Sequence, residues 1–200
     1  EPLSALDAPA RAGLRGALRR ALEAAELPAV VVTHDRTEAL ALGDRILVLV
    51  DGLIRQAGPV DEVFAHPADA EVAAVVGTEN IVPVRLVGRA GGLATVRAGP
   101  VELVALDPGG LEDAAFACFR AEEVVIEDAP LAASSARNLL TGTIAERWDE
   151  GALVRLRVEC GISVVALVTR ASAEGMALAP GRQVSLRVKA PAVRLVARGG

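Results

Sequence analysis

The chain has 200 residues, of which 52% are apolar, and its formal net charge is −5. This length and composition suffice for a substantial core and for one or two domains. A mildly acidic chain offers no electrostatic footprint for nucleic acid, which excludes nucleic-acid binding as a main function. No apolar run approaches the roughly 20 residues that a membrane-spanning helix needs. The two cysteines, Cys118 and Cys160, have no metal-ligand spacing, so we expect no metal site and reduced thiols in a cytoplasmic protein.

The first long segment is rich in alanine, leucine and arginine and follows Asp7 and Pro9. This composition predicts a helix with Asp7 as its N-cap, and Pro28 should lie beyond its end. The arginines of this helix are expected to form a solvated face.

An apolar run from Ala29 to Val32 then predicts a buried parallel strand that is covered on both faces. Such a strand would bring His34 to its carboxyl end, where ligands bind in open α/β sheets. Asp35 and Glu38 have the spacing of a capping box, which predicts a helix from about Arg36. On this stretch alone, a solvated loop histidine is the alternative.

The start of the chain, taken together with Thr33-His34-Asp35, resembles the nucleotide-binding subunits of ATP-binding-cassette (ABC) transporters. The matching segment reads Glu1-Pro2-Leu3-Ser4-Ala5-Leu6-Asp7. In that family an acidic pair closes a strand, a Ser-Ala-Leu-Asp loop follows, and a histidine ends the next strand. The resemblance implies that Glu1 is the catalytic glutamate and that His34 contacts the γ-phosphate. It implies that the partner subunit is faced by a loop made of Ser4, Ala5, Leu6 and Asp7.

The same resemblance implies ATP and Mg²⁺ as cofactors, a homodimer, and transmembrane permease subunits as partners at the inner face of the membrane. Two family motifs are absent, the phosphate loop Gly-x-x-x-x-Gly-Lys-Ser/Thr and the signature Leu-Ser-Gly-Gly-Gln. We therefore expect the chain to be the C-terminal part of a longer protein and to be inactive alone as an ATPase. Residues 1–77 would be the α/β remnant of the ATPase domain, with part of its parallel sheet.

Two apolar runs around Asp51-Gly52 predict a hairpin over residues 46–57, and residues 60–65 and 69–76 predict two short helices. From residue 81 onward, short alternating strands are separated by glycine and proline turns, which is typical of a small barrel or sandwich. Apolar and polar residues alternate in residues 154–159 and 184–189, which predicts one buried and one exposed face for each of these strands. Residues 78–200 are therefore expected to form an all-β, OB-like barrel domain. A helix from Thr169 to Ala177, with Thr169 as its cap, is the exception in this half.

A weak internal repeat divides this second half into half-barrels at about residues 80–128 and 134–197. The segment from Arg120 to Ile126 aligns with the segment from Lys189 to Leu195. The first copy carries Glu122 and Glu123 where the second carries proline and alanine. Carboxylates at these positions would repel an anion.

The second copy contains Ser135-Ala136-Arg137-Asn138 and Lys189-Ala190-Pro191. A hydroxyl group, an arginine, a lysine and backbone amides are donors that a tetrahedral dianion requires. Lys189 is the only lysine among 21 basic residues, although a solvated lysine at a strand end is the alternative.

Together these motifs closely resemble the molybdate-binding Mop domains, called TOBE domains when they are attached to transporter ATPases. The resemblance covers about residues 134–196 and implies that molybdate or tungstate binds between domain copies. The implied ligands are Ser135, Ala136, Arg137, Lys189 and Ala190. The sequence therefore predicts the ATP-binding subunit of a molybdate importer. The alternatives are a sulfate, iron or polyamine importer with a structural β domain, and a stand-alone, non-catalytic oxyanion-binding module.

Overall fold

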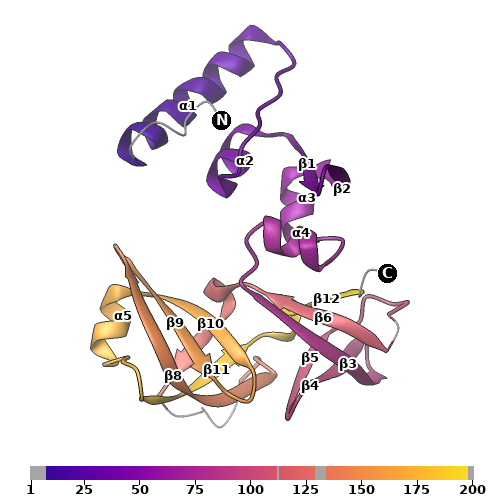
Figure 1. Cartoon of the computed structure of the whole chain (residues 1–200), viewed down its shortest axis with the longest axis vertical. Coiled ribbons are helices and arrows are strands. Elements are labelled where there is room, and N and C mark those ends of the chain that lie inside the picture. Colours follow the sequence, from indigo (N-terminus) through magenta and orange to yellow (C-terminus); the bar gives the residue numbers. More distant parts are fainter. Residues whose placement is uncertain (1–7, 112, 129–133, 198–200) are drawn as a thin grey trace. The chain divides into compact units, whose positions relative to one another are not determined.

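The computed structural model describes residues 8–111, 113–128 and 134–197 (Figure 1). Contacts divide the chain into two compact units, residues 1–68 and 69–200. The boundary expected near residue 77, between the ATPase remnant and the all-β domain, stays a prediction. In the structure the helix α4 (Ala70–Val75) belongs to the second unit, because it packs against two strands of that unit.

The described part of the first unit contains three helices and one antiparallel hairpin. In chain order these elements are α1 (Ala8–Ala25), α2 (Arg36–Leu42), β1 (Arg45–Val50), β2 (Leu53–Pro59) and α3 (Val60–Ala65). The predicted hairpin is confirmed, with Asp51 and Gly52 at positive φ values of 50° and 78° in its turn. The guanidinium of Arg19 on α1 donates to the Leu42 carbonyl (2.9 Å) and to Asp44 (2.8 Å), so this arginine is not simply solvated.

The start of α2 agrees with the prediction, and its polar contacts explain why. The Asp35 carboxylate accepts hydrogen bonds from the backbone amides of Thr37 (2.7 Å) and Glu38 (3.2 Å). These bonds satisfy two of the amides that every helix leaves unpaired at its first turn. The buried Glu38 accepts from the Thr33 hydroxyl instead of completing a capping box.

The buried strand predicted at Ala29 to Val32 is wrong. Residues 27–33 form neither helix nor strand, and the side chains of Val30 and Val32 are 93% and 71% exposed. A strand is stable only when neighbours take up its backbone hydrogen bonds, and no strand of the described chain pairs with this segment. Among the described residues of the first unit there is accordingly no parallel sheet, and the ATPase remnant is not confirmed.

The second unit is mostly β-sheet and contains two five-stranded antiparallel sheets (Figure 1). One sheet has the order β12-β6-β3-β4-β5 and the other the order β10-β9-β8-β11-β7. The strands from the first repeat are β3 (Asn80–Ala90), β4 (Leu93–Ala98), β5 (Val101–Leu106), β6 (Ala114–Phe119) and β7 (Val125–Glu127). The strands from the second repeat are β8 (Asn138–Glu150), β9 (Leu153–Glu159), β10 (Ser163–Thr169), β11 (Gln183–Val188) and β12 (Arg194–Ala197).

The two repeats exchange their last strands. β7 of the first repeat pairs with β11 of the second, and β12 of the second repeat pairs with β6 of the first. One 3₁₀ turn precedes each exchanged strand, η1 (Ala121–Glu123) and η2 (Ala190–Ala192). The predicted alignment of these two segments is therefore matched by their structure, although neither sheet is built from one repeat alone.

One hydrophobic core joins both sheets, with inward side chains such as Val96, Leu103, Ile144 and Leu156. The predicted alternation holds for β9, but β11 differs because its outward residues Ser185 and Arg187 are also buried. β11 lies between β8 and β7 in its sheet, and every one of its residues after Gln183 is buried. The predicted cap at Thr169 is confirmed, since its hydroxyl accepts from the Ser172 amide at the start of α5 (Arg170–Gly175).

Gly142 on β8 lies at a close backbone approach, because a Cβ there would be 2.4 Å from the carbonyl oxygen of Glu159. We expect Gly142→Ala to lower the free energy of unfolding by about 1 to 3 kcal/mol, since a backbone carbonyl cannot move aside cheaply. Gly88→Ala on β3 is the control, as a Cβ there meets nothing within 4 Å. Urea denaturation compares both variants, and equal midpoints would contradict the close approach.

Candidate functional site

The two motifs predicted to bind an oxyanion meet at one end of the β8-β11 pair. These strands are antiparallel, and their last registered pair joins Val188 to Asn138. Lys189 follows Val188 directly and Arg137 precedes Asn138, so both lie at the same end of this strand pair. The register therefore brings together motifs that are about fifty residues apart in the sequence.

The donors at this end of the strands differ in their exposure. Ser135, Arg137 and Lys189 are exposed, Ala136 is half-buried, and Ala190 is 4% exposed. The Ser134 hydroxyl accepts from the Ala136 amide (3.1 Å), which fixes the turn before β8. No hydrogen bond from the Ala190 amide is found among the described residues. An exposed cation pair next to a buried amide is a suitable donor set for a tetrahedral anion.

Arg187 lies two residues before Lys189 but has a different role. Its guanidinium donates to the Glu127 carboxylate at 2.7 Å, and both side chains are largely buried, at 8% and 16% exposure. This pair links β11 to the exchanged strand β7 and neutralises the arginine. Arg187 therefore belongs to the scaffold beneath the candidate site.

Two buried asparagines also link the two repeats, through hydrogen bonds from their side chains to the backbone. The Asn138 side chain donates to the Val104 carbonyl (2.9 Å) and accepts from the Val104 amide (2.6 Å). Asn80, at the start of β3, makes the equivalent pair of bonds to Val165 (2.9 and 2.7 Å). Each asparagine thus binds the backbone of the other repeat, and because Asn138 directly follows Arg137, its bonds hold the chain next to that arginine.

The position in the first repeat that is equivalent to Arg137 carries a carboxylate, which the sequence analysis missed. Glu79 precedes Asn80 and accepts a hydrogen bond from the Ala121 amide (3.1 Å), and its other oxygen is 3.4 Å from Arg155. The comparison of Thr78-Glu79-Asn80 with Ala136-Arg137-Asn138 contains the signal that could have found it. Burial, the Glu122 carboxylate and Glu79 raise the pKa of nearby Glu123, against the opposing charge of Arg194.

The residues predicted for nucleotide chemistry are only partly within the described chain. Glu1, Ser4, Ala5, Leu6 and Asp7 lie outside the described residues. His34 is exposed and directly precedes Asp35, the N-cap of α2. Among the described residues, no group of three or more His, Cys, Asp or Glu could hold a metal ion. None of the described helices is long and apolar enough to cross a bilayer.

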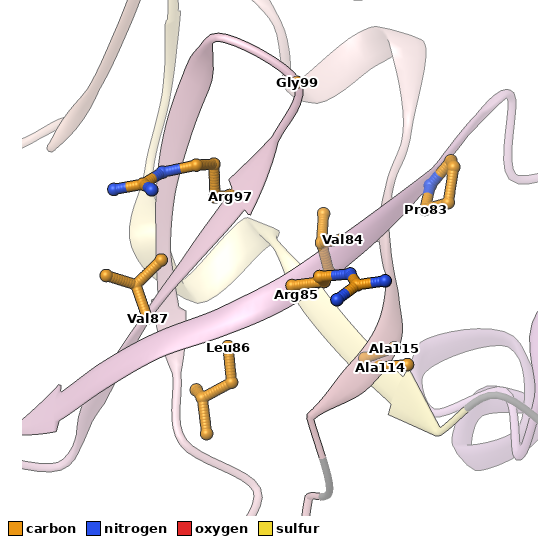
Figure 2. Close-up of a pocket in the computed structure, with 9 residues that line it drawn as sticks. All are labelled: Pro83, Val84, Arg85, Leu86, Val87, Arg97, Gly99, Ala114 and Ala115. Carbon is orange, nitrogen blue, oxygen red and sulfur yellow. The ribbon is translucent and has the colours of Figure 1, made fainter.

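A pocket of about 490 Å³ lies away from these motifs, on the sheet of the first repeat. Figure 2 shows Arg85 of β3 and Arg97 of β4 among its lining residues. The two arginines occupy directly opposed positions on neighbouring strands. Arg97 is paired with Glu102 at 2.6 Å. None of the site residues predicted from the sequence lines this pocket.

Comparison with known families identifies one segment of the second unit. Residues 134–195, which contain both oxyanion motifs, match the TOBE domain family. This chain contains a TOBE domain. The TOBE domain segment begins at the turn before β8 and ends within β12, so it includes the complete candidate site.

The relatives of the chain are ATP-binding subunits of ABC importers. The Fe(3+) ions import ATP-binding protein FbpC of Agrobacterium fabrum is 41% identical over 102 residues, which are 51% of this chain and 29% of that protein. The molybdate/tungstate import ATP-binding protein WtpC of Pyrococcus abyssi is 32% identical over 165 residues, covering 82% of this chain and 46% of WtpC. This chain therefore spans less than half the length of either relative.

A solved structure also resembles the chain, that of the cytoplasmic molybdate-binding protein ModG with molybdate bound. The TM-score is 0.54 at 21% identity, and the match covers 61% of this chain and 98% of ModG. At this identity the likeness concerns the fold alone. It agrees with the all-β, OB-like architecture that was expected for residues 78–200.

Proposed function

We propose that this chain belongs to the ATP-binding subunit of an ABC importer for molybdate or tungstate, and that its TOBE domain binds the oxyanion. The proposed ligands are Ser135, Ala136, Arg137, Lys189 and Ala190. The observation that carries this proposal is the pairing of Val188 with Asn138, which joins the two motifs at one end of the strands. The similarity to WtpC supports the choice of oxyanion.

The donor set suits a dianion for electrostatic reasons. Lys189 and Arg137 supply two positive charges, and the Ser135 hydroxyl and the Ala190 amide supply directional hydrogen bonds. Arg187 adds no free charge, because Glu127 neutralises it. Binding between two domain copies would remove the anion from water and strengthen each of these interactions.

Other relatives support a second candidate within the same class. They are named for import of spermidine/putrescine, of Fe(3+) ions and of sulfate/thiosulfate. In such an importer the TOBE domain would be structural. The near-complete coverage of ModG supports a further candidate, a non-catalytic oxyanion-binding module.

The nucleotide side of the proposal rests on residues that this chain would contribute to a larger site. Glu1 and His34 are assigned to the ATP site, and the loop from Ser4 to Asp7 to the contact with the second subunit of a homodimer. The sequence lacks a phosphate loop. Hydrolysis of ATP, and coupling to permease subunits at the cytoplasmic face of the membrane, are therefore assigned to the complete subunit.

Calorimetric titration of the 200-residue chain with molybdate, tungstate, sulfate and phosphate tests the proposal. We expect molybdate and tungstate to bind about tenfold or more tightly than sulfate or phosphate, because larger dianions lose less hydration energy on burial. Preference for sulfate would favour the sulfate importer. The absence of binding by any of the four anions would leave the TOBE domain with a structural role.

A further inference from the structure

The two repeats place opposite charges at one equivalent position. Glu79 precedes Asn80, and Arg137 precedes Asn138, whose side chains make matching bonds to the other repeat. Ala121 and Ala190 are likewise equivalent, since each opens the 3₁₀ turn that precedes an exchanged strand. The residue before the asparagine and the amide of the turn can therefore be compared directly.

In the first repeat this amide already has an anionic partner. The Ala121 amide donates to Glu79 at 3.1 Å, and the second carboxylate oxygen of Glu79 lies 3.4 Å from the guanidinium of Arg155. The Glu79 side chain is 22% exposed, so these contacts are partly shielded from water. A backbone amide and a cation are the same kinds of donor that the second repeat offers to an external anion.

In the second repeat the described residues provide no corresponding carboxylate partner. Arg137 has no acceptor oxygen on its side chain. The described residues contain no acceptor for the Ala190 amide, although that residue is buried. A buried amide without a partner is costly. An external anion that accepted a hydrogen bond from the Ala190 amide would therefore make the same interaction that the Glu79 carboxylate makes with the Ala121 amide.

We infer that Glu79 is a built-in anion that closes the first repeat, so that each chain binds a single oxyanion, at the second repeat. This inference rests on the proposed function and adds the number of sites and the residue that sets it. The carboxylates of Glu122 and Glu123 lie in the same region and oppose a further negative charge there.

Amide hydrogen exchange followed by NMR on the 200-residue chain, with and without molybdate, tests this inference. We expect the Ala121 amide to be protected without molybdate and the Ala190 amide to gain protection only when molybdate is added, with one molybdate bound per chain. Glu79→Ala should speed exchange at Ala121 by about tenfold, because one hydrogen bond to a charged acceptor is lost. Added molybdate should partly restore that protection.

Glu102→Ala is the matched control, since Glu102 is also a partly exposed glutamate paired with an arginine, Arg97 at 2.6 Å. It should change exchange at neither amide. Two molybdates per unmodified chain, or unchanged exchange at Ala121 in Glu79→Ala, would overturn the inference. If no anion protects Ala190, the proposed function fails, while the Glu79→Ala result still decides whether the carboxylate holds the Ala121 amide.

Discussion

Replacing Lys189 by alanine is expected to weaken molybdate binding by about ten- to a hundredfold. A dianion needs several converging donors, and a charge-assisted hydrogen bond contributes roughly 1.5 to 3 kcal/mol. Lys189 is exposed, so its loss should leave the fold intact. Titration calorimetry with molybdate measures the affinity, and thermal denaturation without the anion verifies that stability is unchanged.

The control for Lys189→Ala must remove one exposed positive charge elsewhere. Arg187 is unsuitable, because removing its buried guanidinium would leave Glu127 without its partner. Arg85→Ala is better matched, since Arg85 is exposed on β3 and lines the pocket of Figure 2. Equal losses of molybdate affinity in both variants would mean that Lys189 attracts the anion only nonspecifically. A larger loss in Arg85→Ala would place the anion in that pocket.

Asn138→Ala is expected to lower the free energy of unfolding by roughly 2 to 5 kcal/mol. The variant removes two hydrogen bonds and leaves the amide and carbonyl of Val104 without partners, each at a cost of about 1 to 3 kcal/mol. Asn80→Ala should cost a similar amount, because it breaks the same two bonds to Val165. Guanidinium chloride denaturation monitored by circular dichroism gives these values.

Gln183→Ala serves as the control for the two asparagine variants. Gln183 carries an amide side chain on a strand of the same unit, but it is exposed at the start of β11. Its loss should change stability by less than about 0.5 kcal/mol. If all three variants have the same free energy of unfolding, the hydrogen bonds between the repeats contribute no more to stability than surface contacts do.

Local signals in the sequence were sufficient for elements whose stability is local. The turn at Asp51-Gly52, the caps at Asp35 and Thr169, and the alternation of β9 each depend on residues close in the chain. The predicted anion motifs could also be recognised in the sequence, because Ser135 to Asn138 and Lys189 to Pro191 are compact patterns, and their role in binding stays a prediction. That they meet depends on the β8-β11 register, which the pairing supplies.

Features that depend on residues distant in the sequence could not be predicted from such local patterns. Val30 and Val32 have the composition of a buried strand, but a strand also needs neighbours, and the described chain provides none. Arg187 looked like an outward residue of an alternating strand until β7 brought Glu127 against it. Glu79 went unnoticed because its partners Ala121 and Arg155 are 42 and 76 positions away.

The exchange of end strands constrains how this protein can fold while it is being made. The first sheet needs β12, which comes from the end of the second repeat, so the ribosome must have passed residue 197 before that sheet is complete. Until then β6 has one unpaired edge, and an open edge is a site for wrong pairing between nascent chains. Such long-range pairing also makes folding slow. Synthesis interrupted between the repeats would therefore release an incomplete sheet rather than a smaller folded domain.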